Sequence, residues 1–218
     1  MDKKDIERRF LTITQRAAGD DDKPIIEGDA AVFDQETVIG SWFREKIAAG
    51  AFKRVLSEKP DVVAAFNHNW DIVLGRTTAG TLTLEERDKS LFYSCEINTS
   101  DPDAMGVYQR VKRGDVSQAS FAFTVRKEEW ANTPENSKEL PLRTITEVDE
   151  LFDVGPCTFG AYPEASAQAR SKADEFQNRV DPVEPQERSA GEAPETSPQE
   201  QAENERRRLE FLKVKFTK

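Results

Sequence analysis

The sequence predicts a mainly β fold of the α+β class, in which the strands form a closed or partly open barrel surrounded by helices. Short apolar runs, alternating or continuous, recur between turn residues from about residue 8 to residue 170. Only two segments carry helix signals. The chain also lacks a regular strand–helix alternation and a glycine-rich phosphate-binding loop, which argues against a nucleotide-binding fold.

The strands are predicted from the spacing of apolar residues. Residues 62–66 form a continuous apolar run, typical of a buried strand. The polar stretch 86–89 separates two apolar segments and is a hairpin signal. The predicted strands are 9–14, 25–33, 62–66, 80–85, 91–97, 116–125 and 143–154.

Two helices are predicted. Residues 49–56 have helical character and end before Pro60. Residues 101–112 have stronger signals, because Asp101 is a good N-cap, Pro102 fits the first helical position and Gly114 is a stop signal.

The composition predicts one folded domain and a long polar extension. Hydrophobic residues make up 37% of the chain and charged residues 33%, so part of the chain lacks the apolar surface for a core. Residues 172–207 are rich in Glu, Gln, Pro, Ser and Ala and are predicted to be a disordered linker or tail. Residues 208–218 form a short basic and apolar segment, a helix, a docking peptide or a frayed end. The folded domain is therefore predicted to span residues 1–171.

Charge and composition argue against several classes of function. A net charge of −10 disfavours nucleic-acid binding. No apolar run approaches the roughly 20 residues that cross a membrane, and residues 1–9 lack the apolar core of a secretory signal. Cys95 and Cys157 are isolated, which fits a reducing cytoplasm. One histidine and two scattered cysteines predict no metal site, and we expect no cofactor.

His68 is the one histidine of the chain, and any Ser–His or Cys–His mechanism must use it as the base. It follows the apolar run 62–66 in the sequence Phe66-Asn67-His68, where a buried strand ends. Rigidly held functional groups are common at such positions. A structural turn histidine remains the alternative.

Ser120 is a candidate nucleophile on the predicted strand 116–125. In a strand, Ser120 shares one face with Ala122 and Thr124, and phenylalanines fill the other face. The small neighbours leave room for a substrate, and a serine needs a neighbouring base to become nucleophilic. Ser117 lies three positions earlier and is a second candidate.

An acidic side chain can orient the imidazole and stabilise its protonated form. Glu147, Asp149 and Asp153 of the predicted strand 143–154 are all eligible. A solvated strand face is the usual place for such acids.

Several motifs, taken in order over about residues 8–171, resemble the tailed-bacteriophage prohead protease family. That family in turn resembles the herpesvirus assemblins, which are β-barrel serine proteases surrounded by helices. The motifs that carry the resemblance are 28–33, 43–52, 66–68, 74–77, 114–121 and 151–163.

The resemblance implies site residues. Its order along the chain is histidine, serine and a third residue, which is a second histidine in the herpesviruses. This chain has no second histidine, so an acidic third member is implied. Glu147 is the best positional match, with Asp149 and Asp153 left open. The family places its nucleophile directly before a phenylalanine, which implies Ser120 rather than Ser117.

The implied activity is that of a serine endopeptidase that acts during phage prohead maturation. The implied substrates are the scaffolding segment of the major capsid protein, separate scaffold proteins and the protease itself, in the bacterial host cytoplasm inside the assembling prohead. The implied protein works without a cofactor and forms dimers or larger assemblies. At Gly155 the chain departs from the family, because many members carry serine there.

Two other functions remain open at this point. A non-catalytic capsid or scaffold protein can keep the same barrel without the chemistry. A hydrolase can use a carboxylate pair, such as Glu147 with Asp149 or Asp153, although Trp42, Trp70 and Trp130 are too scattered to form a sugar-binding platform.

Overall fold

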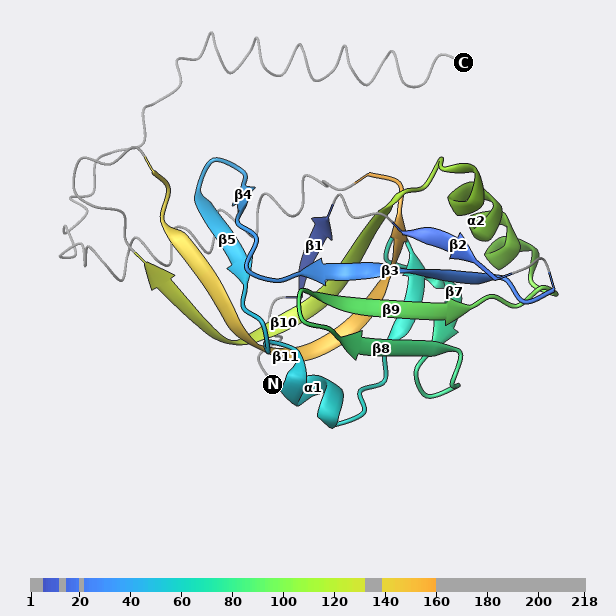
Figure 1. Ribbon diagram of the computed structural model, residues 1–218, viewed down its shortest axis with the longest axis horizontal. Coiled ribbons are helices and arrows are strands. Elements are labelled where there is room, and N and C mark those ends of the chain that lie inside the picture. Colours follow the sequence, from blue (N-terminus) through green and yellow to red (C-terminus); the bar gives the residue numbers. More distant parts are fainter. Residues whose placement is uncertain (1–5, 12–14, 20–21, 132–138, 160–218) are drawn as a thin grey trace, which may run out of the picture. The chain divides into compact units, whose positions relative to one another are not determined.

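The structure is a computed structural model, and it describes residues 6–11, 15–19, 22–131 and 139–159 (Figure 1). The chain divides into two units, Met1–Val180 and Asp181–Lys218, and every described residue belongs to the first unit. The predicted linker at 172–207 and the C-terminal segment at 208–218 lie outside the described residues, as does the predicted domain end at residue 171.

A seven-stranded sheet contains the two longest strands, β10 and β11, which pair antiparallel along most of their length (Figure 1). β11 is the central strand, because it also pairs in parallel with β5 and with β6. The members in sheet order are β1 (Glu7–Leu11), β10 (Gln118–Ala131), β11 (Leu142–Cys157), β5 (Phe43–Ile47) and β4 (Thr37–Ile39), with β6 (Val63–Phe66) on β11 and β7 (Asn69–Arg76) on β6.

A second sheet of four strands packs with the first around one core. Its order is β2 (Arg16–Ala18), β3 (Ile25–Val32), β9 (Ser90–Glu96) and β8 (Leu82–Glu86). One cluster of buried apolar side chains draws on both sheets, with Leu91 and Tyr93 from the smaller sheet and Phe121 and Phe123 from the larger. The rings of Phe121 and Phe123 stack at 4.8 Å between centroids.

The predicted mainly β fold with few helices is confirmed. Of the two predicted forms of the barrel, closed or partly open, the closed form is not found. A barrel requires its end strands to pair. Over the described residues, β1 and β4 end one path of pairing and β2 and β8 end the other, and no pairing joins these ends. The strands therefore form two open sheets instead of one closed barrel.

Two helices occur in the described part of the chain, and neither has the length and apolar character needed to cross a membrane. Helix α2 (Pro102–Arg113) begins and ends as predicted: the Asp101 carboxylate accepts from the backbone N–H groups of Asp103 and Ala104, and Gly114 ends the helix at φ +90°. Helix α1 is shorter than predicted, Lys53–Ser57, because Ile47 still belongs to β5 and turns follow it.

A buried group of charges fixes the edge strand β1 against the sheet. The Arg143 side chain of β11 is fully buried and donates to Glu7 of β1 and Glu45 of β5 at 2.7–2.9 Å, and also to Glu128 of β10. Arg9 of β1 donates to the same Glu7 and Glu45. Burial alone lowers the pKa of Arg143, but the hydrogen bonds with Glu7 raise that pKa above its ordinary value. The guanidinium therefore stays charged and holds β1 beside β10.

Candidate active site

His68 occupies the tip of the hairpin between β6 and β7. Phe66 pairs with Asn69, so Asn67 and His68 are the two loop residues, and their φ angles are +54° and +57°. Two loop residues with positive φ define a type I′ turn, whose twist matches that of the flanking strands. Residues other than glycine adopt positive φ only rarely, although asparagine and histidine do so more often than most. The turn thus holds the His68 residue in an uncommon backbone conformation at the end of a buried strand.

Asn67 fastens this turn to the end of β11. Its backbone N–H donates to the carbonyl oxygen of Pro156 at 3.0 Å. Its side-chain amide donates to Thr158 Oγ1 at 3.2 Å and accepts from the Thr158 N–H at 2.9 Å. Three hydrogen bonds leave the loop little freedom, so the position of the His68 ring follows the position of β11.

Ser120 lies on β10 with its hydroxyl turned toward the imidazole. Ser120 Oγ lies 2.5 Å from His68 Nε2 and 2.9 Å from the carbonyl oxygen of Arg9, so two acceptors lie within reach of the hydroxyl. Ser120 is buried, whereas Ser117 is exposed and precedes β10. Of the two predicted serines, the structure therefore brings only Ser120 to His68.

Asp153 of β11 contacts the imidazole on the side opposite Ser120. Its Oδ1 lies 2.6 Å from His68 Nδ1, and its Oδ2 accepts from the indole N–H of Trp70 at 2.8 Å. The Asp153 side chain is only 1% exposed. A buried carboxylate needs hydrogen-bond donors, and these two contacts give one donor to each oxygen.

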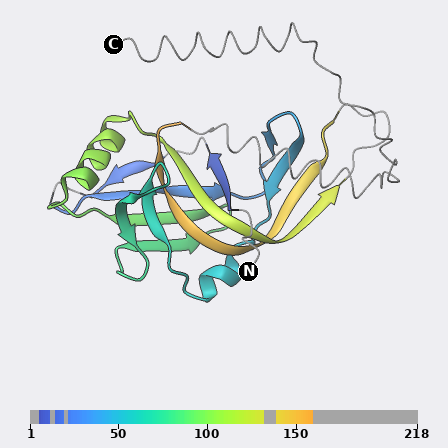
Figure 2. The same cartoon turned by 180° about the vertical axis from the view of Figure 1, so that it is seen from behind.

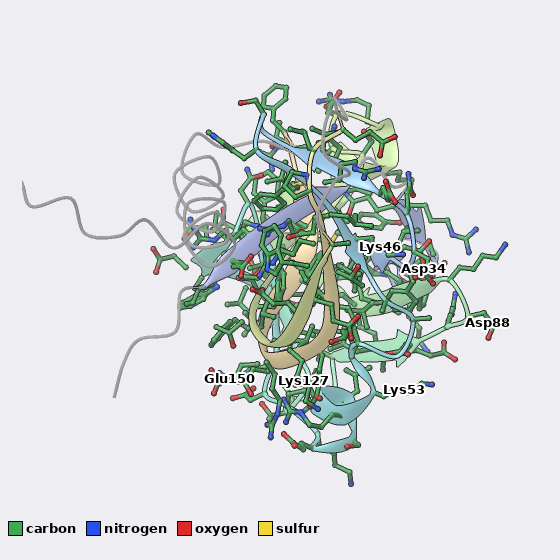
Figure 3. The ribbon with its side chains drawn as sticks, turned by 90° about the vertical axis from the view of Figure 1, so that its left-hand side faces the viewer. Asp34, Lys46, Lys53, Asp88, Lys127 and Glu150 are labelled. Carbon is green, nitrogen blue, oxygen red and sulfur yellow. The ribbon has the colours of Figure 1, made fainter. Side chains whose placement is uncertain are left out.

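The structure does not bring Glu147, the third member that the resemblance implied, to His68. Glu147 forms ion pairs with Arg54 at 2.8 Å and with Lys127 at 2.5 Å, in a part of the β10–β11 ladder where Figure 3 labels Lys127 and Glu150. Asp149 likewise faces Arg54. Glu147 and Asp153 are six positions apart along β11, roughly 20 Å at the usual rise.

The pKa of Glu147 reflects these basic neighbours. The hydrogen bond from Lys127 lowers it below the ordinary value for glutamate, and the charges of Arg126 and Arg54 act in the same direction. A carboxylate paired in this way is held by cations instead of by imidazole.

Both cysteines are buried and poorly suited to act as nucleophiles. Burial raises the pKa of the Cys95 thiol and of the Cys157 thiol to about 12 in each case. A thiol becomes a nucleophile only as the thiolate. Across the described ranges, no group of three or more His, Cys, Asp or Glu side chains is placed to hold a metal ion.

The cluster of Ser120, His68 and Asp153 has the arrangement of a hydroxyl activated by an oriented base. Its members come from β10, from the β6–β7 turn and from β11, which lie side by side in Figure 2. Sequence reasoning assigned no role to Asn67 and Trp70, although both flank His68 and carry the donors that tie the turn to β11. Their closeness to the one histidine was the available signal.

Comparisons with known proteins bear on this cluster. The sequence model of a family described as "Caudovirus prohead serine protease" matches residues 11–179. No curated protein matches the chain significantly. The solved structure of the bacteriophage T4 capsid assembly protease, gp21, matches 69% of this chain and 98% of its own chain, with a TM-score of 0.37 and 9% sequence identity. The family match spans most of the chain and includes every residue of the cluster, and on this match the chain belongs to the caudovirus prohead serine protease family.

Proposed function

We propose that this protein is a serine endopeptidase that cleaves capsid and scaffold proteins, and itself, during prohead maturation. Ser120 is the nucleophile, His68 the general base and Asp153 the acidic third member. The observation that carries the proposal is the position of the imidazole, which lies 2.5 Å from the Ser120 hydroxyl and 2.6 Å from a buried carboxylate. Family membership supports the same reaction class.

The carboxylate decides which ring nitrogen carries the proton. An ionised Asp153 only accepts hydrogen bonds, so His68 Nδ1 donates to it. The neutral ring then has its lone pair on Nε2, which faces Ser120 Oγ. Asp153 thus keeps the imidazole in the tautomer that a general base needs.

The reaction follows from this geometry. His68 Nε2 takes the proton of Ser120 as Oγ forms a bond to the peptide carbonyl carbon. The imidazolium next gives this proton to the leaving amine as the peptide bond breaks, which leaves an ester on Ser120. Water then attacks the ester with the same base, and the acid product and free Ser120 are released.

The Arg9 carbonyl gives the hydroxyl a second acceptor. When His68 is neutral, Ser120 donates to Nε2. When His68 is protonated, Nε2–H donates to Oγ and the hydroxyl donates to the Arg9 carbonyl oxygen, 2.9 Å away. The serine is therefore hydrogen-bonded in both protonation states, and β1 helps to fix its rotamer.

The proposed substrates are the scaffolding segment of the major capsid protein, separate scaffold proteins and further copies of this chain. Their enclosure with the protease inside an immature capsid raises the local concentration, so that weak binding suffices for cleavage.

The test is co-expression of the major capsid protein of the same phage with this chain, with product lengths read by intact-protein mass spectrometry. The wild type shortens the capsid protein, and Ser120→Ala leaves it at full length. Asp153→Asn slows cleavage by about 10⁴-fold, because the amide favours the wrong tautomer of the base.

Two matched variants control this experiment. Ser117→Ala removes an exposed serine that precedes β10, and Glu147→Gln removes a carboxylate held by Arg54 and Lys127. Both are expected to cleave like the wild type. Full processing by a folded Ser120→Ala variant would contradict the nucleophile, and loss of cleavage in Glu147→Gln but not in Asp153→Asn would contradict the third member.

A further inference from the structure

Trp70 is a half-exposed tryptophan whose indole N–H is committed to a buried carboxylate. Trp70 is 51% exposed and is one of the few large apolar residues that are exposed in the described part of the chain. Its Nε1 nonetheless donates to Asp153 Oδ2 at 2.8 Å, while the Asp153 side chain is 1% exposed. The polar end of the ring points inward and the apolar part faces outward, opposite to the usual placement of a tryptophan at a protein surface.

This contact fixes the orientation of the carboxylate. An indole N–H is a donor only, so it holds Oδ2 as an acceptor. Oδ1 accepts from His68, and the two donors together define the plane of the carboxylate. Rotation of that plane would break one of the two hydrogen bonds inside a buried site, which is costly.

The two donors come from one hairpin. His68 is the second loop residue and Trp70 is the second residue of β7, so a single intervening residue sets their separation. Asn67 anchors the same loop to Thr158. The hairpin is therefore hydrogen-bonded from both sides of His68, to Thr158 directly after β11 and to Asp153 within it.

We propose that Trp70 is a positioning residue for the reaction: its N–H holds Asp153 so that Oδ1 stays aligned with His68 Nδ1. This inference rests on the proposed function, because it assigns Trp70 a part in the chemistry of Ser120. In this role Trp70 acts through Asp153 alone.

The experiment compares Trp70→Phe with the wild type in two measurements. The first is the rate at which a fluorophosphonate probe labels Ser120, which reports activation of the serine without requiring a peptide substrate. The rate is expected to fall by about 10- to 100-fold, the size of one lost hydrogen bond to a charged group. The second is the NMR signal of the Nδ1 proton of His68, which belongs to the one histidine of the chain. This signal is expected to broaden by exchange with water in Trp70→Phe.

Two further variants separate positioning from packing. Trp130 also donates its indole N–H to a carboxylate, Glu128 Oε1 at 3.0 Å, outside the cluster, so Trp130→Phe is a matched control that leaves the rate and the proton signal unchanged. In Trp70→Gln the amide nitrogen lies the same number of bonds from Cα as the indole nitrogen. Trp70→Gln is therefore expected to recover part of the rate that Trp70→Phe loses.

Several results overturn the inference. One is unchanged labelling together with an unchanged proton signal in Trp70→Phe. Another is a loss of labelling rate in Trp70→Gln or in Trp130→Phe that equals the loss in Trp70→Phe. Slower cleavage of the capsid protein with normal labelling makes Trp70 a substrate contact instead. A wild-type chain that neither reacts with the probe nor cleaves contradicts the proposed function, whereas the Nδ1 signal still tests the hold of Trp70 on Asp153.

Discussion

Gly155 of β11 lies directly opposite Ser120 of β10 in the antiparallel ladder. Its φ is +150°, and a Cβ at this position would lie 2.5 Å from the backbone oxygen of Ala65 on β6. At this point only the backbone of β11 lies between β10, which carries Ser120, and β6, which leads to His68. This close approach explains why a glycine occupies position 155 in this chain.

Gly155→Ala is expected to disturb both stability and the site. The added methyl group must displace β6, and the unfavourable φ adds strain of about 1–3 kcal/mol. Movement of β6 moves His68 away from Ser120, and a displacement near 1 Å costs about 100-fold in rate. Urea unfolding and fluorophosphonate labelling measure the two effects. Gly80→Ala is the matched control, because Gly80 also has positive φ but has no atom within 4 Å of the added Cβ. It should lose stability without losing labelling.

The left-handed conformation of His68 predicts an order of stability among inactive variants. His68→Gly and His68→Ala both remove the imidazole, and both should fail to label Ser120. Glycine tolerates φ +57°, whereas alanine has a penalty of about 1–2 kcal/mol there. His68→Gly should therefore unfold at higher urea than His68→Ala. Equal midpoints would mean that the turn adopts another conformation in solution.

The lowered pKa of Glu147 predicts a pH-dependent contribution to stability. Its folded-state pKa lies below its unfolded-state value, chiefly because Lys127 donates to it. The stabilisation is therefore complete above the ordinary pKa of glutamate and is lost as the pH falls through the lowered value. Urea unfolding of wild type and Glu147→Gln should differ at pH 7, and the difference should shrink as the pH falls through the lowered value. High salt should reduce the difference at pH 7, since these charges are partly screened. Identical stability at pH 7 would contradict the ion pairs.

Burial of the two thiols predicts selective chemistry with covalent reagents. Because the pKa of each thiol is raised to about 12, iodoacetamide at pH 8 should leave Cys95 and Cys157 unmodified in the folded protein. Both should react after unfolding in urea. Labelling of Ser120 by the fluorophosphonate should proceed unchanged after iodoacetamide treatment. Loss of labelling by iodoacetamide alone would point to a cysteine mechanism.

Local patterns predicted the elements whose signals lie within a few residues of sequence. The apolar run 62–66 became β6, and the caps at Asp101 and Gly114 mark the ends of α2. The strands at 80–85 and 91–97 became the hairpin of β8 and β9. The strands β2, β4, β5 and β7 were not predicted. Of these, β5 pairs with β11, a strand far along the chain, whereas β2, β4 and β7 pair with neighbouring strands.

The candidate site was only partly predictable, because it depends on how the strands pair. Ser120 and His68 were recognisable by residue type and position, but the choice among three acids on one strand depends on register. The β10–β11 ladder shifts register at several points between Ala122 and Glu128. Alternation counted along the sequence cannot follow such irregularities. The residues alone therefore left Glu147, Asp149 and Asp153 open, and the resemblance favoured Glu147, whereas the structure pairs Asp153 with Val63 of β6.

The position of β11 late in the sequence also determines when the site can form. The site joins residues that lie far apart in the sequence. Ser120 and His68 are 52 positions apart, His68 and Asp153 are 85 apart, and Ser120 and Arg9 are 111 apart. Contacts across such spans form late, after long loops have closed. A ribosome-bound chain that ends before β11 holds neither Asp153 nor the glycine opposite Ser120. Under the proposed mechanism, nascent and prematurely terminated copies therefore lack a complete site, and this latency follows from the order of the strands.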